Sequence, residues 1–272
     1  MPSLSLLWAL LTPAAGAAVL DCGVFKVHQL ELGQMANYQY IVENGQEAVT
    51  VDAAWDIPRM QRYLQKQDLK LVAALYTHGH YDHIGGSAPG MSQGPPLQGA
   101  REMSAAKVPL FIGAKDIGAA TLQTRLDEST WRPLEEGDNL SLLGDKVQIQ
   151  VIDTPGHTLG GVTFWFRSLH PALRAECAEG LLFTGDTLFL KNVGRTDLPG
   201  GDAATLQRSL ARLSTAPAGA QVLPGHSYDS PPRRGNIATA RGDCAMMRSA
   251  VQKFPPSTLP PLPVLANRQS AE

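Results

Sequence analysis

Cysteine is scarce in this 272-residue chain, which contains only Cys22, Cys177 and Cys244. Their number is odd, they lie far apart in the sequence, and no C-x-x-C pair is present. The pattern therefore predicts neither a disulfide framework nor a thiolate zinc site. A reducing compartment, cytoplasmic or organellar, is the simplest expectation from cysteine usage.

An excess of charge of either sign is also missing. The chain has 23 Lys and Arg against 25 Asp and Glu, which gives a net charge of -2. Such a balance provides no electrostatic basis for binding nucleic acid or acidic membranes. With 43% hydrophobic and 18% charged residues, the composition is typical of a soluble globular domain with a sizeable core.

No apolar run is long enough to cross a bilayer. The run 4–11, apolar apart from Ser5, ends at Thr12-Pro13 and is followed by the small residues 14–18. This resembles the h-region and exit of a secretory signal, although Met1-Pro2-Ser3 carries no positive charge. Residues 1–22 are therefore predicted to be a targeting or signal segment or a flexible N-terminal extension.

Histidine is present only seven times, yet five of the seven lie in three short Gly-flanked segments. These are Thr77-His78-Gly79-His80-Tyr81-Asp82-His83, Gly156-His157-Thr158 and Pro224-Gly225-His226, and a fourth segment, Gly185-Asp186-Thr187-Leu188-Phe189, adds a carboxylate. In an extended segment side chains alternate, so His78, His80 and Asp82 would face one way and His83 another. That arrangement favours two adjacent metal ions, and imidazole and carboxylate ligands accept Zn, Fe or Mn.

Most of the chain is predicted to alternate strands with a few helices. The expected strands are 24–32, 36–42, 48–52, 71–76, 108–112, 147–152, 161–166, 181–184 and 221–223. The expected helices are 56–67, 115–122 and an amphipathic one that begins after Asp202. Irregular structure is expected at 127–138, after Tyr228 and at 87–107, which is either a surface loop or a flap beside the histidines.

The motifs H-x-H-x-D-H, G-H-T, G-D-T-L-F and P-G-H, in this order, resemble the metallo-β-lactamase superfamily. The form around Asp186 and the run Gly194-Arg195-Thr196-Asp197-Leu198-Pro199-Gly200-Gly201-Asp202 resemble its glyoxalase II-like (hydroxyacylglutathione hydrolase-like) branch. The resemblance implies an α/β fold, the four-layer αββα metallo-β-lactamase sandwich, for a catalytic domain at 23–245. A Pro-rich C-terminal tail would follow at 246–272.

The resemblance also implies a binuclear metal site. The first ion would take His78, His80 and His157, the second Asp82, His83 and His226, and Asp186 would bridge the two. Zinc is the expected metal, and iron or manganese would fit the same ligands. A bound divalent ion lowers the pKa of its water from about 15.7 to about 7, so a metal-bound hydroxide could attack a carbonyl carbon. We assign Asp82 and His83 a catalytic role in this chemistry.

Four further residues are candidates at the site. The resemblance implies that Asp52 orients a metal-bound histidine, whose second nitrogen needs to be fixed, and that Asp197 plays a related part. A capping carboxylate for Asp52 and a turn residue for Asp197 are the alternatives. Arg195 is predicted to bind a substrate carboxylate, since a guanidinium recognises one with two hydrogen bonds, unless it pairs with a nearby aspartate. Tyr228 would contact substrate or simply pack.

The function implied is that of a metal-dependent hydrolase of thioesters, with S-acylglutathione as the expected small-molecule substrate. The alternative is a mononuclear-iron persulfide dioxygenase (sulfur dioxygenase) of the same fold, which would hold a single iron. A scaffold with a vestigial site is disfavoured by the complete ligand set, and neither a nucleic-acid partner nor a stable membrane span is expected. One departure is that the Pro-, Arg- and Ser-rich segment after His226 does not resemble the helical domain that helps glyoxalase II enzymes hold glutathione.

Overall fold

Two β-sheets pack face to face in the computed structural model, which describes residues 18–87, 95–229 and 232–263. The strands of the first sheet lie in chain order: β1 (Ala18–Asp21), β2 (Lys26–Leu32), β3 (Asn37–Glu43), β4 (Glu47–Val51), β5 (Lys70–Tyr76), β6 (Leu110–Gly113) and β7 (Trp131–Leu134). Pairing is antiparallel from β1 to β4 and parallel from β4 to β7.

The second sheet has the order β13-β12-β11-β10-β9-β8. Its strands are β8 (Asn139–Leu140), β9 (Gln148–Asp153), β10 (Val162–Arg167), β11 (Leu181–Gly185), β12 (Gln221–Pro224) and β13 (Gly235–Asn236). Only β11 and β12 pair in parallel. Because β9, β11 and β12 run in the same direction, the loops that follow them reach the same edge of the sandwich.

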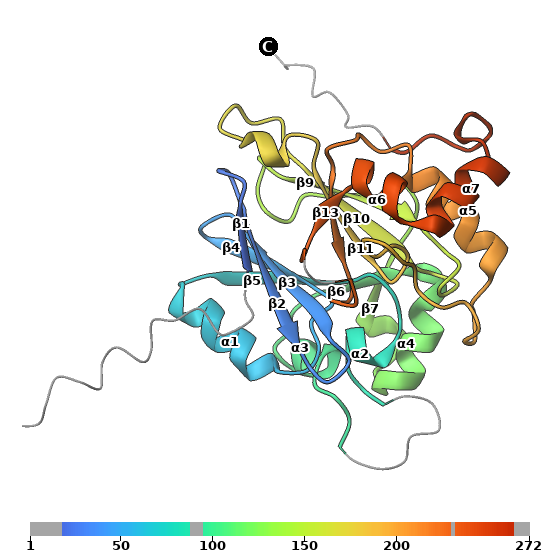
Figure 1. Cartoon of the computed structure of the whole chain (residues 1–272). Helices are drawn as coiled ribbons and strands as arrows, with labels where there is room; N and C mark the ends of the chain where they lie inside the picture. The colour runs from blue at the N-terminus through green and yellow to red at the C-terminus, as the bar shows by residue number, and fades with distance from the viewer. Residues whose placement is uncertain (1–17, 88–94, 230–231, 264–272) are drawn as a thin grey trace, which may run out of the picture.

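Seven α-helices cover the outer faces and edges of the described chain. They are α1 (Ile57–Lys66), α2 (Tyr81–Ile84), α3 (Ala100–Ala105), α4 (Ile117–Thr124), α5 (Ala203–Leu213), α6 (Ile237–Asp243) and α7 (Ala245–Lys253). Figure 1 shows α5, α6 and α7 grouped together on one side of the molecule, away from α1 and α3. Asp56 and Asp202 cap α1 and α5, as predicted. Each carboxylate accepts a hydrogen bond from the backbone N–H of the third residue of its helix, at 3.0 and 2.7 Å.

Three apolar clusters correspond to the three interfaces of a four-layer sandwich. Between the sheets, Val49 and Leu75 of the first lie in one cluster with Phe164 and Phe183 of the second. A second cluster joins the first sheet to α1, α3 and α4, and a third joins the second sheet to α5, α6 and α7. The predicted αββα architecture is therefore confirmed.

Several elements were not predicted from the sequence. The strand β7 lies inside 127–138 and contains Pro133, which is tolerated because β7 is an edge strand. The helix α3 lies inside the supposedly irregular 87–107, and α6 and α7 follow Tyr228. These elements are short, so their periodicity is weak, and packing against neighbours stabilises them instead.

The predicted domain limits differ from the described fold at both ends. Residues 18–22, assigned to the N-terminal extension, contribute strand β1 and Cys22. At the other end α7 occupies the beginning of the predicted tail and packs on α5. Residues 1–17, the 88–94 part of the predicted flap and 264–272 of the tail lie outside the described residues.

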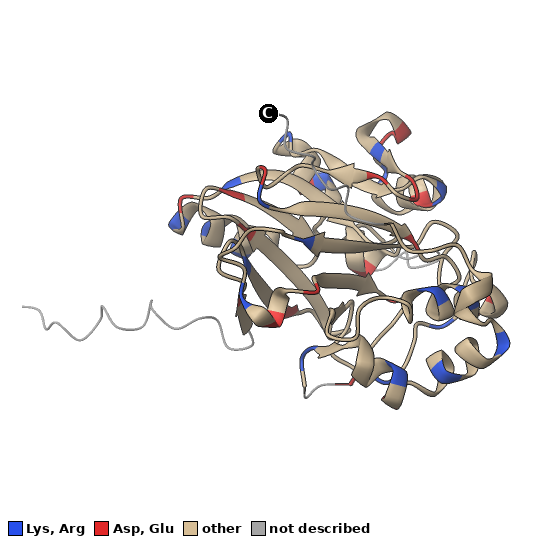
Figure 2. Cartoon of the chain, turned by 90° about the horizontal axis from the view of Figure 1, so that it is seen from above, with Lys and Arg blue, Asp and Glu red and all other residues tan. Residues whose placement is uncertain are grey.

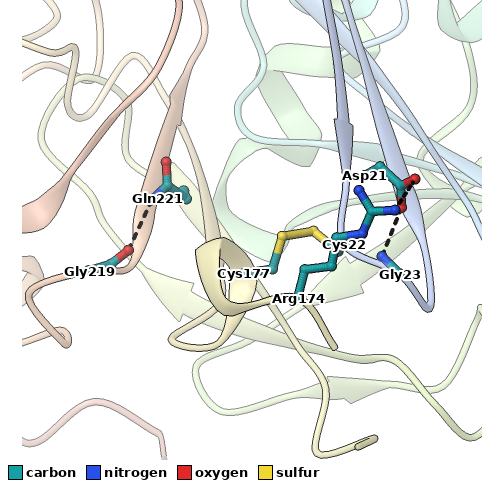
Figure 3. Close-up of a disulfide and its surroundings, with 7 residues drawn as sticks. All are labelled: Asp21, Cys22, Gly23, Arg174, Cys177, Gly219 and Gln221. Carbon is teal, nitrogen blue, oxygen red and sulfur yellow. Dashed lines mark hydrogen bonds and ion pairs between the residues drawn. A yellow bond between two sulfur atoms is a disulfide. The ribbon is translucent and has the colours of Figure 1, made fainter. Parts of the chain in front are cut away.

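The expectation that the cysteines stay unpaired is wrong, because Cys22 and Cys177 form a disulfide (Figure 3). Their Cα atoms are 5.6 Å apart although 155 residues separate them in sequence. Cys22 follows β1 of the first sheet, and Cys177 lies between β10 and β11 of the second, so the bond ties the two sheets together. Beside it, Arg174 pairs with Asp21 at 3.0 Å. Cysteine usage therefore no longer argues for a reducing compartment, since disulfides persist mainly in oxidising ones.

Charged residues of both signs are spread along the described chain, with Lys and Arg interspersed among Asp and Glu (Figure 2). Within the described ranges no helix combines the length and the apolar character that crossing a membrane would require.

Candidate metal centre

All seven predicted ligands lie at one edge of the sandwich, because each ligand loop leaves the end of a strand. The strand β5 leads into His78 and His80, and α2, which follows at once, carries Asp82 and His83. The strands β9, β11 and β12 end just before His157, Asp186 and His226. The Gly before His226 is needed there, because a Cβ on Gly225 would collide with Asp186 Oδ1.

The seven side chains form two triads with a carboxylate between them. His78, His80 and His157 form the first, and Asp82, His83 and His226 the second; within each, the potential ligand atoms lie within 4.8 Å of one another. In the first, His157 Nε2 lies 3.0 Å from His80 Nδ1; in the second, His83 Nε2 lies 3.1 Å from His226 Nε2. Asp186 Oδ2 is 3.5 Å from His157 Nε2 and 3.3 Å from His226 Nε2, so it faces both triads.

The site has the features of a centre for divalent cations. His78 Nε2 and Asp186 Oδ1 are buried and have no hydrogen-bond partner, although buried polar atoms nearly always have one. Burial alone would lower the pKa of His226, but Asp186 and Asp82 outweigh it and raise that pKa to about 9. The same negative field favours a divalent cation, and this donor set of nitrogen and carboxylate oxygen suits zinc, iron or manganese.

Four of the five histidine rings have the second nitrogen occupied, which leaves Nε2 for a metal. His157 Nδ1 lies 2.6 Å from the carbonyl of Arg195, and His226 Nδ1 lies 2.8 Å from the carbonyl of Met35. His83 Nδ1 lies 3.1 Å from Asp52 Oδ2, and His78 Nδ1 lies 3.1 Å from the hydroxyl of Thr77. The rings are thus oriented by the fold.

The family is shown by comparison with known proteins. Residues 32–226 match the Metallo-beta-lactamase superfamily profile. The chain belongs to this superfamily. A hydroxyacylglutathione hydrolase of Synechococcus sp. (strain CC9605) is 32% identical over 192 residues, 71% of this chain and 66% of that protein. The probable polyketide biosynthesis zinc-dependent hydrolase BaeB of Bacillus velezensis is 30% identical over 76% of this chain and 81% of its own length.

Among solved structures, TTHA1623 in a di-iron-bound form superposes with a TM-score of 0.60 and 29% identity, over 80% of this chain and 98% of that one. The glyoxalase II-like branch predicted from the motifs agrees with the hydroxyacylglutathione hydrolase relative. The predicted hydrolase agrees with the names of both relatives, and its metal dependence agrees with the zinc-dependent hydrolase BaeB. The chain spans about two thirds of the length of the Synechococcus relative.

Asp52 contacts both the loop that carries His78 and the ring of His83. Its Oδ1 accepts from the backbone N–H of Thr77 at 2.7 Å, and its Oδ2 accepts from the Thr77 hydroxyl at 2.7 Å and lies 3.1 Å from His83 Nδ1. The side chain is almost fully buried. Asp52 therefore contacts both the start of the ligand loop and His83, as the predicted orienting role requires.

Replacing Asp52 by alanine is expected to lower zinc affinity about 10- to 100-fold, the usual effect of losing a group that orients a ligand. Titration against a chromophoric chelator measures this. Asp56→Ala is the matched control. Asp56 caps α1, and the cap hydrogen bond joins its carboxylate to the backbone N–H of Arg59, which is not a candidate ligand. Equal zinc affinities in the two variants would contradict the role of Asp52.

Two residues at the second triad were not predicted. Asn37 donates from Nδ2 to Asp82 Oδ2 at 2.9 Å, and Trp55 donates from Nε1 to the Asp82 carbonyl at 3.0 Å. Asn37 opens β3 and Trp55 lies between β4 and α1, so neither is near a ligand in sequence. Only the packing of these loops against α2 brings them to Asp82.

The remaining predicted site residues have different surroundings. The Asp197 carboxylate accepts from Arg195 Nε at 2.7 Å and Nη2 at 2.6 Å, and both side chains are exposed. In the described structure Asp197 thus faces Arg195 and not a candidate ligand, so a ligand-orienting role for Asp197 is not supported. The Tyr228 ring stacks on His226, with centroids 4.4 Å apart and planes at 8°, and remains 57% exposed.

Proposed function

We propose that the chain is a metal-dependent thioesterase of the glyoxalase II type that hydrolyses S-acylglutathione with two divalent ions, zinc before iron or manganese. The observation that carries this proposal is the pair of triads with Asp186 facing both. Two bound ions would supply hydroxide at neutral pH and polarise the thioester carbonyl. A nucleophilic Ser or Cys is then unnecessary.

Residues at the second triad would fix its ligands and form the surface beside them. The Asp82 carboxylate and the His83 ring, each fixed by a buried partner, would keep the second position rigid. Tyr228, stacked on His226 and packed edge-on against Phe189 at 5.3 Å, would form an apolar wall beside it. An acyl group that lies against this wall would be beside the second triad.

Hydrolysis of S-lactoylglutathione by the zinc-loaded chain tests the proposal. We expect turnover of about 1 to 1,000 per second, the ordinary range for enzymes. The second assay measures oxygen uptake with glutathione persulfide by the iron-loaded chain. Oxygen uptake without thioester hydrolysis would contradict the proposal and favour the persulfide dioxygenase.

Arg195 is the proposed contact for a glutathione carboxylate. Its backbone carbonyl is hydrogen-bonded to His157, so its side chain starts at the rim of the site, and the guanidinium is exposed. Arg195→Ala is expected to raise KM for S-acylglutathione about 10- to 100-fold, since a hydrogen bond to a charged group contributes about 1.5–3 kcal/mol. KM for a small neutral thioester should hardly change.

Asp197→Ala is the matched control, because it removes the partner that competes for the same guanidinium. It should leave KM for S-acylglutathione unchanged or lower it. Equal increases in KM for both substrates in Arg195→Ala would contradict a role in carboxylate recognition.

A further inference from the structure

Asp116 is a buried carboxylate at the start of α4 that contacts two ligand loops at once. It ends a short 3₁₀ turn, η2 (Ala114–Asp116), and its side chain is nearly inaccessible. Oδ2 accepts from the backbone N–H of Gly79 at 2.9 Å and from the hydroxyl of Thr158 at 2.7 Å. Oδ1 accepts from the backbone N–H of Gly160 at 2.6 Å. All three are donors, so the ionised carboxylate matches them.

Two of these three partners lie directly beside ligands of the first triad, and Gly160 lies in the same loop as His157. Gly79 separates His78 from His80, and Thr158 follows His157. The two loops leave different sheets, from the ends of β5 and β9. A single carboxylate therefore connects the parts of the chain that supply all three ligands.

The same helix holds the Gly79 peptide from its other side. Gln123 of α4 donates from Nε2 to the Gly79 carbonyl. Gly79 also lies against the helix, since a Cβ there would be 3.5 Å from the Ala119 Cβ and from the Ala120 nitrogen. Gly79, between His78 and His80, is thus bonded at its backbone N–H by Asp116 and at its backbone carbonyl by Gln123.

We propose that Asp116 is a positioning residue that sets the spacing of His78, His80 and His157 and thereby the metal affinity of the first triad. The inference rests on the proposed function, because it presupposes a metal at that triad. Asp116→Asn tests it sharply: an amide keeps the size of the side chain, but its NH₂ group would face a backbone N–H donor. No pattern in the sequence indicates this role, since Asp116 there looks only like part of a helix start.

The first experiment measures zinc binding to the full chain by competition with a chromophoric chelator. In Asp116→Asn we expect one of two zinc equivalents to weaken about 10- to 100-fold, as for other groups that orient ligands, while the second keeps its affinity. Asp56→Asn is the matched control, because Asp56 is also an aspartate at a helix start and its cap contact lies away from the ligands. The control should bind zinc like the wild type.

Amide hydrogen exchange of the metal-free chain gives a second measurement. In Asp116→Asn the Gly79 and Gly160 amides should exchange at least about 10-fold faster, the factor that corresponds to about 1.4 kcal/mol. Amides of α5 should be unchanged, which distinguishes a local effect from general destabilisation.

The outcomes separate the two proposals. If the wild type binds two zinc ions and Asp116→Asn binds both equally well, the positioning role is overturned and the proposed function stands. If both zinc equivalents weaken alike with faster exchange throughout, Asp116 is merely structural. If the wild type binds no zinc, the proposed function and this inference fail together.

Discussion

Asp186→Ala is expected to abolish thioester hydrolysis and to leave the chain with little bound metal. Asp186 Oδ2 lies 3.5 Å from one triad and 3.3 Å from the other, so its loss removes a ligand from both positions. It also removes the negative charge beside three imidazole Nε2 atoms, those of His83, His157 and His226. The loss in kcat/KM should well exceed the roughly 100-fold effect typical of groups that only orient ligands.

Metal content and kcat/KM of the same preparations measure this effect. Asp56→Ala, away from the site, should retain both. Circular dichroism of the metal-free proteins shows whether Asp186→Ala is folded, which separates loss of metal from loss of structure. Full metal occupancy in a folded Asp186→Ala variant would contradict the bridging role.

Removal of the disulfide should have the largest effect on stability. Cys22→Ala/Cys177→Ala is expected to lose about 2–5 kcal/mol of unfolding free energy, because the bond closes a very long loop in the unfolded chain. Both cysteines are buried in the core between the sheets, so lost packing adds to the effect. Denaturant unfolding of the metal-free double variant and the wild type measures the difference.

Cys244→Ala is the control, since Cys244 is a buried cysteine outside the disulfide. It should cost much less. Thiol titration of the denatured, unreduced wild type should find a single free thiol, from Cys244. Three free thiols, or equal stabilities of the double variant and wild type, would contradict a structural disulfide.

The fold was largely predictable because its strands carry strong local signals. The alternating stretch at 147–152 became β9, and the buried run at 71–76 became β5. Short elements were missed for the opposite reason: β1, β7 and α3 contain too few residues for a period to show. The disulfide was missed because distance in sequence says nothing about which cysteines the two sheets bring together.

The ligands of the site were easier to predict than their supports. Ligands need particular side chains in glycine-flanked loops, so His78, His157 and His226 stand out in the sequence. Asn37 and Asp116 act through hydrogen bonds to loops that are remote in sequence, and such residues have no distinctive pattern. For Arg195 the sequence allowed two arrangements, contact with a substrate carboxylate or pairing with a nearby aspartate. The structure pairs it with Asp197.

Elemental analysis of the purified full-length chain tests the central claim most directly, because it counts metals per chain and identifies them. Two triads that share Asp186 predict about two ions per chain, mostly zinc. About one iron per chain would contradict the binuclear hydrolase and favour persulfide oxidation. Little metal of any kind, even after reconstitution with zinc, would contradict a metal-dependent activity altogether.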